Sequence, residues 1–179
     1  MITVAVSGPD NVGKSTQIRL LAHVDGVDRA EVLDAHDPRW ADAHARGLAD
    51  WWFRRAALEK VVDVLACSYL ARSAAVDCAD VVRLIDRGMP MLEASVVATA
   101  AVRERLSYEA AVQRARELLA RYRDDLDGAD AGEWGVLLLQ ATDPAAGTRR
   151  ALSREREELQ QFDCEPIQRR RRDAATAKG

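Results

Sequence analysis

The spacing of apolar residues along the chain predicts short strands that alternate with longer helices. Four apolar runs have the length of a strand, and they lie at 2–6, 30–33, 81–85 and 135–141. Between them, apolar residues recur at the three- and four-residue spacing of amphipathic helices. These helices are expected at 17–22, 42–76, 91–105 and 107–125, the last with Ser107 as its N-cap. Strands that alternate with helices favour an α/β fold built on a parallel sheet.

A loop is predicted over residues 34–40, at the carboxyl end of the second strand. Pro38 disfavours helical geometry at the residue before it, which is Asp37. Open α/β sheets bind their ligands at the carboxyl ends of strands. Asp37 is therefore a candidate substrate-binding residue.

Composition limits the chain to one folded domain over residues 1–179. Apolar residues make up 48% and charged residues 31%, which excludes a disordered chain. The net charge of −3 provides no overall attraction to nucleic acid or to an anionic membrane. No apolar run reaches the roughly 18 residues of a membrane span, and the chain opens on a strand, so the expected location is the cytoplasm. The cysteines show no C-x-x-C spacing and are expected to be packed thiols at positions 67, 78 and 164.

The first strand leads directly into the pattern G-x-x-x-x-G-K-[ST], which is typical of a phosphate-binding loop. Lys14 would reach the outer phosphates of ATP, and the Ser15 hydroxyl would help to hold Mg²⁺. The helix that follows would place its N-terminus beneath the same anion. The alternative is a tight turn that only joins strand to helix. The predicted nucleotide-binding residues are Gly8, Asn11, Val12, Gly13, Lys14, Ser15 and Thr16.

The third strand ends in Asp86-Arg87, beside the predicted phosphate loop. Asp86 could orient Mg²⁺ or accept a proton from the substrate, and Arg87 could bind the phosphate of an acceptor. The alternative is an ion pair at the surface. Asp86 is accordingly a candidate metal ligand, together with Ser15.

An aromatic segment with two arginines, Trp51 to Arg55, lies in the predicted helix at 42–76. An aromatic ring flanked by arginines suits a planar substrate that carries a phosphate. Trp52 and Arg54 are therefore candidate substrate-binding residues. The alternative is that the aromatic side chains are core residues and the arginines are solvated.

An arginine-rich helix is predicted after the turn at Thr142-Asp143-Pro144. Helical spacing places Arg150 and Arg154 on one side, where they could clamp a triphosphate as a lid over about 146–160. The alternative is a solvated helix of alternating charge. The basic tail at 168–179 has no aromatic residues for stacking, so nucleic-acid binding is not expected.

Together, the phosphate loop, Asp86-Arg87, and Asp143-Pro144 before an arginine-rich helix resemble the thymidylate kinase group of P-loop nucleoside and nucleotide kinases. The resemblance implies a three-layer fold with a parallel sheet flanked by helices and a short lid. It also implies transfer of the γ-phosphoryl group of Mg·ATP to a small-molecule acceptor. By position, Asp10 would approach the acceptor sugar or Mg²⁺, Arg87 would hold the acceptor phosphate, and Arg150 and Arg154 would serve the lid.

The chain departs from that family at the acceptor side. Gly88 follows Asp-Arg where the family has an aromatic residue or histidine, and no fifth strand is evident for the adenine loop. Arg72, or Arg54 with Arg55, is a candidate for reading an acceptor base. The acceptor is thus a nucleotide, a nucleoside or a similar small molecule, and a homodimer is left open.

Two other functions are considered. A GTPase switch would need an N-K-x-D motif, and the sequence has none. A P-loop module that binds a nucleotide without turning it over, or a regulatory NTPase, remains the alternative to a kinase.

Overall fold

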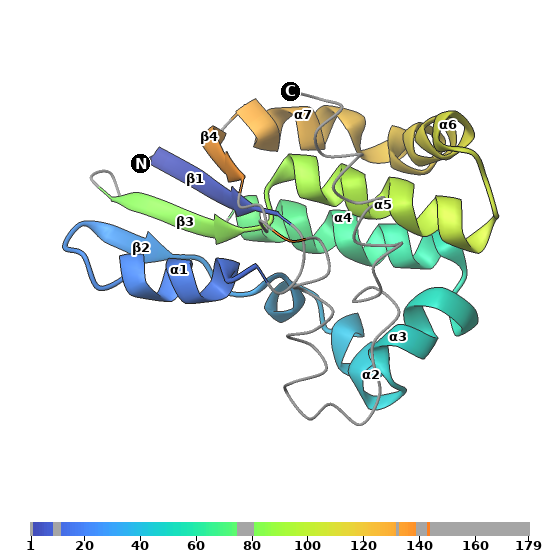
Figure 1. Cartoon of the computed structure of the whole chain (residues 1–179), viewed down its shortest axis with the longest axis horizontal. Coiled ribbons are helices and arrows are strands. Elements are labelled where there is room, and N and C mark those ends of the chain that lie inside the picture. The colour runs from blue at the N-terminus through green and yellow to red at the C-terminus, as the bar shows by residue number, and fades with distance from the viewer. Residues whose placement is uncertain (1, 9–11, 75–80, 132, 139–142, 144–179) are drawn as a thin grey trace.

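The computed structural model describes residues 2–8, 12–74, 81–131, 133–138 and 143 (Figure 1). Its four strands form one parallel sheet in the order β2-β3-β1-β4. The predicted α/β class with a parallel sheet is therefore confirmed. The strands are β1 (Ile2–Ser7), β2 (Val27–Arg29), β3 (Val82–Asp86) and β4 (Glu133–Leu138).

Ten helical segments connect these strands in the described part of the chain. Seven are α-helices: α1 (Lys14–Leu21), α2 (Arg39–Ala45), α3 (Leu48–Asp50), α4 (Leu58–Ala74), α5 (Met89–Arg103), α6 (Tyr108–Leu119) and α7 (Arg123–Ala131). The other three are short: the 3₁₀ turns η1 (Leu33–His36) and η3 (Ala120–Tyr122), and the π-helical turn η2 (Trp51–Arg55).

Strand register brings the ends of β1 and β3 together. Val6 lies opposite Asp86, so the third strand ends beside the residues that open the predicted phosphate loop. The chain leaves β1 towards β2 on one side, and it leaves β3 towards β4 on the other side. Two neighbouring strands whose connections diverge in this way form a crevice at their carboxyl ends, where α/β sheets bind ligands.

Helix α1 covers one face of the sheet. Ile18 packs on Val6 and Leu84, which alternate with residues that point to the opposite face. On that opposite face, Ala5 and Ile85 are buried as well. Burial on both faces explains why these two strands read as nearly continuous apolar runs in the sequence.

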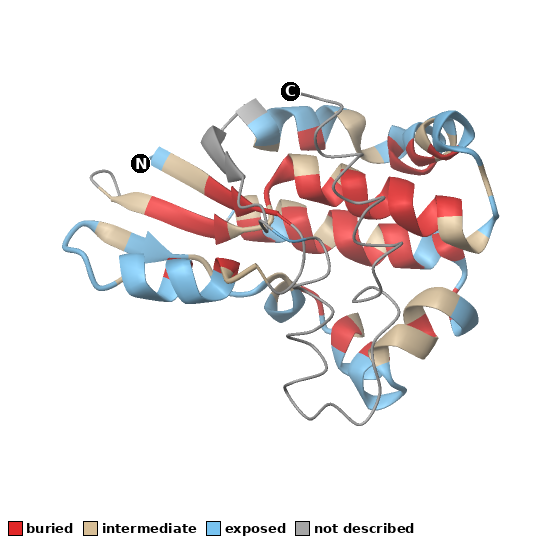
Figure 2. Cartoon of the chain, viewed as in Figure 1, coloured by how far each residue is buried: buried red, intermediate tan, exposed pale blue. Residues whose placement is uncertain are grey.

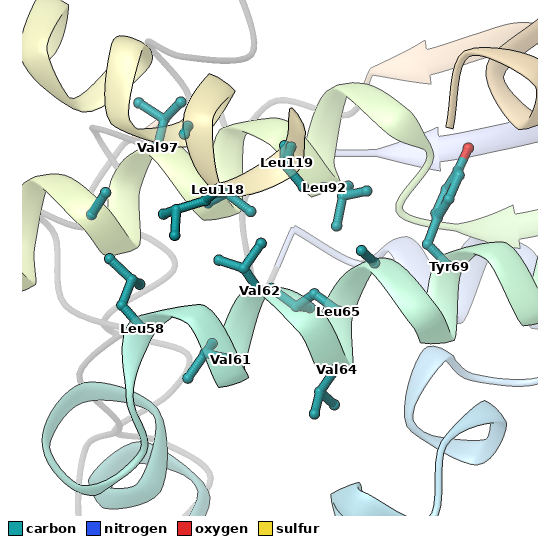
Figure 3. Close-up of a cluster of buried hydrophobic side chains, with 14 of the residues drawn as sticks. Leu58, Val61, Val62, Val64, Leu65, Tyr69, Leu92, Val97, Leu118 and Leu119 are labelled. Atoms are coloured by element: carbon teal, nitrogen blue, oxygen red, sulfur yellow. The ribbon is translucent and has the colours of Figure 1, made fainter. Parts of the chain in front are cut away.

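The larger cluster of buried apolar side chains contains residues of α4, α5 and α6 and no described residue of the sheet. Figure 2 shows α4 and α5 buried along most of their length. Figure 3 shows Val62 and Leu65 of α4 facing Leu92 of α5, with Leu118 and Leu119 of α6 closing the cluster. The Ser107 hydroxyl accepts a hydrogen bond from the Ala110 amide at 3.3 Å, which confirms the predicted N-cap of α6.

The second strand was placed three residues too late. It occupies Val27–Arg29, because Val27 packs beside Val82 in the core beneath α1. Ala30 still donates a backbone hydrogen bond to Leu84 at 2.9 Å, but the remainder of the predicted strand leaves the sheet and coils into η1. The predicted loop at 34–40 was likewise only partly right. Asp37 is extended, as Pro38 requires, but α2 begins immediately after that proline.

Two predicted helices are interrupted. The helix expected at 42–76 breaks at Gly47, whose φ of 79° is left-handed, and again at Ala56, which is extended. The helix expected to run from Ser107 to Asp125 ends at Leu119 and continues as η3 and α7. The last predicted strand begins two residues early, and its end at 139–141 lies outside the described residues, as do the lid and the basic tail.

No described helix combines the length and the apolar character needed to cross a membrane.

Candidate active site

The described ends of the predicted phosphate loop are two glycines with left-handed backbone geometry. Gly8, directly after β1, has a φ of 144°, and Gly13, the N-cap of α1, has a φ of 97°. Both values favour glycine. The first intrahelical amide donor is Gln17, which bonds Gly13 at 3.0 Å. The three preceding amides of α1 therefore have no acceptor within the helix, and amides at this position are the usual donors to a bound anion.

Lys14 is the first residue of α1, and its side chain is 5% exposed. A lysine is rarely buried unless its charge is compensated. Ser15 and Thr16 lie on the exposed side of the same turn, and Val12 is half-buried before it. Residues 9–11 are not among those described, so Asp10 and Asn11 stay predictions.

The Ser15 side chain meets the end of β3. Its hydroxyl donates a hydrogen bond to Oδ2 of Asp86 at 3.2 Å. The other carboxylate oxygen, Oδ1, is buried and has no hydrogen-bond partner among the residues that the structure describes. A buried carboxylate oxygen without a donor is costly, and a hydroxyl beside a carboxylate is a ligand pair that Mg²⁺ accepts. These two residues therefore fit the metal that the sequence implies.

The turn after β3 is tied to β1. Arg87 has a φ of 67°, a left-handed conformation that is uncommon for a residue other than glycine. Its amide donates to the Val6 carbonyl at 3.0 Å, and the next amide, that of Gly88, donates to the Ser7 hydroxyl at 3.3 Å. Backbone strain of this kind persists where the surroundings enforce it, often at functional sites.

Arg72 reaches the same turn from α4. Its side chain is fully buried, and its guanidinium donates to the carbonyl oxygens of Asp86 and Arg87. The structure thus brings four of the predicted site residues together: Ser15, Arg72, Asp86 and Arg87. Sequence reasoning missed Ser7, which looks like one more small residue of a buried strand.

The aromatic segment lies elsewhere. Trp51 is a core residue, and the indole N–H of Trp52 donates to the Thr99 hydroxyl at 2.9 Å. Thr99 lies ten residues along α5 from Met89, which corresponds to about 15 Å of helix away from the Asp86-Arg87 turn. The arginines that follow, Arg54 and Arg55, are exposed and pair with Asp50.

Asp37 is engaged within the protein. It accepts hydrogen bonds from the amide and Nε of Arg39, both at 2.9 Å, and Arg39 also pairs with Asp63 on α4. Asp63 further accepts from Arg121 and Tyr122. This network joins α2 to α4 and η3. Sequence reasoning missed Arg39 and Asp63, although Asp-Pro-Arg is a spacing at which an aspartate bonds the backbone two residues on.

The network should make the protein sensitive to acid. Hydrogen bonds from Arg39 lower the pKa of Asp37. At Asp63, burial raises the pKa, but hydrogen bonds from Tyr122 and Arg39 outweigh it, and the pKa is lowered. A carboxylate whose pKa is lower in the folded protein than in the unfolded chain stabilises the fold at pH values above the unfolded-chain pKa of about 4. This stabilisation is lost as the pH falls through the folded-state pKa. We therefore expect the free energy of unfolding, measured with urea, to drop below about pH 4.

Asp63→Asn should flatten that acid dependence. Asp42→Asn is the matched control, because the Asp42–Arg46 pair is exposed and contributes little. An unchanged pH profile in Asp63→Asn would contradict the assignment.

Comparison with models of known protein families and with curated proteins found no match to this chain.

Proposed function

We propose that this protein is an ATP-dependent phosphotransferase with the three-layer fold of the thymidylate kinase-like P-loop kinases. One observation carries the proposal: Ser15, at the start of α1, meets Asp86, at the end of the neighbouring strand, with one carboxylate oxygen left without a donor. A phosphate loop that only joined strand to helix would have no need of this arrangement. The crevice between β1 and β3 is also where this sheet topology binds ligands.

The proposal gives each residue a role. The amides of α1 and Lys14 bind the phosphates of ATP, and Ser15 and Asp86 hold Mg²⁺. When bound, Mg²⁺ neutralises charge on the phosphates. Arg87 binds the acceptor, while Asp10, Arg150 and Arg154 act from segments outside the described residues. The acceptor is a nucleotide, a nucleoside or a similar small molecule.

The test is formation of ADP from Mg·ATP in the presence of a panel of acceptors. The panel comprises nucleosides, nucleoside monophosphates and small phosphorylated or hydroxylated metabolites. Acceptor-dependent ADP formation, lost in Lys14→Ala, would support a kinase. ATP binding without ADP formation for any acceptor would favour a binding module instead.

Arg87→Ala tests the acceptor side. We expect the KM for a phosphorylated acceptor to rise at least about tenfold, because a hydrogen bond between charged groups is lost. Alanine and arginine both carry a Cβ atom, so the left-handed φ of 67° costs the variant and the wild type about the same. The substitution therefore removes the side-chain charge without changing the backbone strain. The measurement is steady-state kinetics with the best acceptor of the panel. An unchanged KM would indicate a neutral acceptor.

A further inference from the structure

Arg72 is a buried cation whose described hydrogen bonds go to backbone. Its side chain, near the end of α4, is 0% exposed. Nη1 donates to the Asp86 carbonyl oxygen at 2.5 Å, and Nη2 donates to the Arg87 carbonyl oxygen at 2.8 Å. The planar guanidinium presents two donors at a fixed spacing, which suits two adjacent carbonyls and which lysine cannot reproduce.

The turn that Arg72 holds contains Asp86, the candidate metal ligand, and Arg87, the candidate acceptor-binding residue. The Asp86 side chain accepts a hydrogen bond from Ser15, and Arg87 has the left-handed φ. On its other side, the turn is bonded to β1 through Val6 and Ser7. Hydrogen bonds from strand β1 and from helix α4 therefore hold the turn on both sides. A strained backbone persists where its surroundings fix it in this way.

We infer that Arg72 is a positioning residue, which holds the Asp86-Arg87 turn so that the Asp86 carboxylate faces Ser15 and the Arg87 side chain leaves the sheet in one direction. The catalytic part of this inference rests on the proposed function. To read an acceptor base directly, the Arg72 guanidinium would have to abandon two charge-assisted hydrogen bonds. Its effect on the reaction is therefore exerted through Asp86 and Arg87.

The chain provides a matched control in Arg103. This half-buried arginine also donates to two carbonyls, those of Trp52 at 3.0 Å and Ala56 at 2.6 Å, but at the end of the π-helical turn η2. Arg72→Met and Arg103→Met thus remove the same type of contact at two places. A general loss of stability would affect both the Asp86-Arg87 turn and the end of η2. Loss of one arginine's hydrogen bonds would affect only the segment that this arginine contacts.

Amide hydrogen exchange of the full-length protein without nucleotide measures this directly. In Arg72→Met, the amides of Arg87 and Gly88 should exchange at least about tenfold faster, and the Ala56 amide should not change. In Arg103→Met, the pattern should be reversed. Arg72→Lys, which keeps the charge and supplies one donor group, should give an intermediate rate. Equal acceleration of both segments in Arg72→Met, or no acceleration at Arg87 and Gly88, would overturn the inference.

Nucleotide binding tests the consequence for the site. In the wild type, Mg²⁺ should lower the Kd for ATP. In Arg72→Met this decrease should be mostly lost, while the Kd for ATP without Mg²⁺ should stay the same. kcat should fall about 100-fold, as expected when reacting groups are misplaced by about 1 Å. Arg103→Met should keep the Mg²⁺ effect, and a kcat in Arg72→Met equal to that of Arg103→Met would contradict positioning. If the wild-type protein binds no ATP, the proposed function fails, and hydrogen exchange still decides the role of Arg72 in holding the turn.

Discussion

Lys14→Ala should abolish phosphoryl transfer and leave the fold intact. Lys14 is buried at the N-terminus of α1. In the proposed function its ammonium group binds the phosphates of ATP together with the first amides of that helix. Losing a positive charge aimed at the transferred group costs about 1000-fold in kcat. Alanine is a good helix former, so the start of α1 should persist.

The measurement is ADP formation at saturating Mg·ATP, with circular dichroism and the melting temperature as checks on folding. Lys60→Ala is the control, because Lys60 is an exposed lysine on α4, away from the phosphate loop. Activity that survives in Lys14→Ala within about tenfold of the wild type would exclude a P-loop kinase mechanism.

Asp86→Asn should nearly eliminate activity and should not destabilise the protein in the absence of Mg²⁺. The substitution preserves shape but removes the negative charge proposed to hold the metal, for which a loss of about 100- to 1000-fold in kcat is expected. The Oδ1 atom of Asp86 is buried without a partner in the described structure, so the carboxylate contributes strain rather than stability there. The melting temperature without Mg²⁺ should therefore stay the same or rise.

Added Mg²⁺ and ATP should raise the melting temperature of the wild type but have much less effect on Asp86→Asn. Ser15→Ala, which removes the other proposed ligand, should change activity in the same direction by a smaller factor. If Asp86→Asn melts well below the wild type without Mg²⁺, the Asp86 carboxylate is a structural group and the metal assignment is wrong.

Local sequence signals predicted the elements that depend on neighbouring residues. The strand predicted at 2–6 and the helix predicted at 17–22 correspond to β1 and α1, although α1 begins earlier, at Lys14. Both are local, because Gly13 caps the helix and Ile18 lies in its first turns. The N-cap Ser107 is local in the same way, since its hydroxyl bonds an amide three residues away. The second strand was misplaced because its position depends on Val27 reaching Val82 and the core under α1, more than 50 residues away in the chain.

The sequence by itself determined the α/β class, the phosphate-loop motif and the residue types at the end of β3. Only the tertiary structure decided which of them meet. Ser15 and Asp86 are 71 residues apart, and Arg72 reaches the same turn from a different helix, whereas Trp52, which looked equally suited to a ligand, is bonded to Thr99 on α5. The physical reason is that strand pairing and helix packing set these distances, and both depend on contacts between residues far apart in the chain.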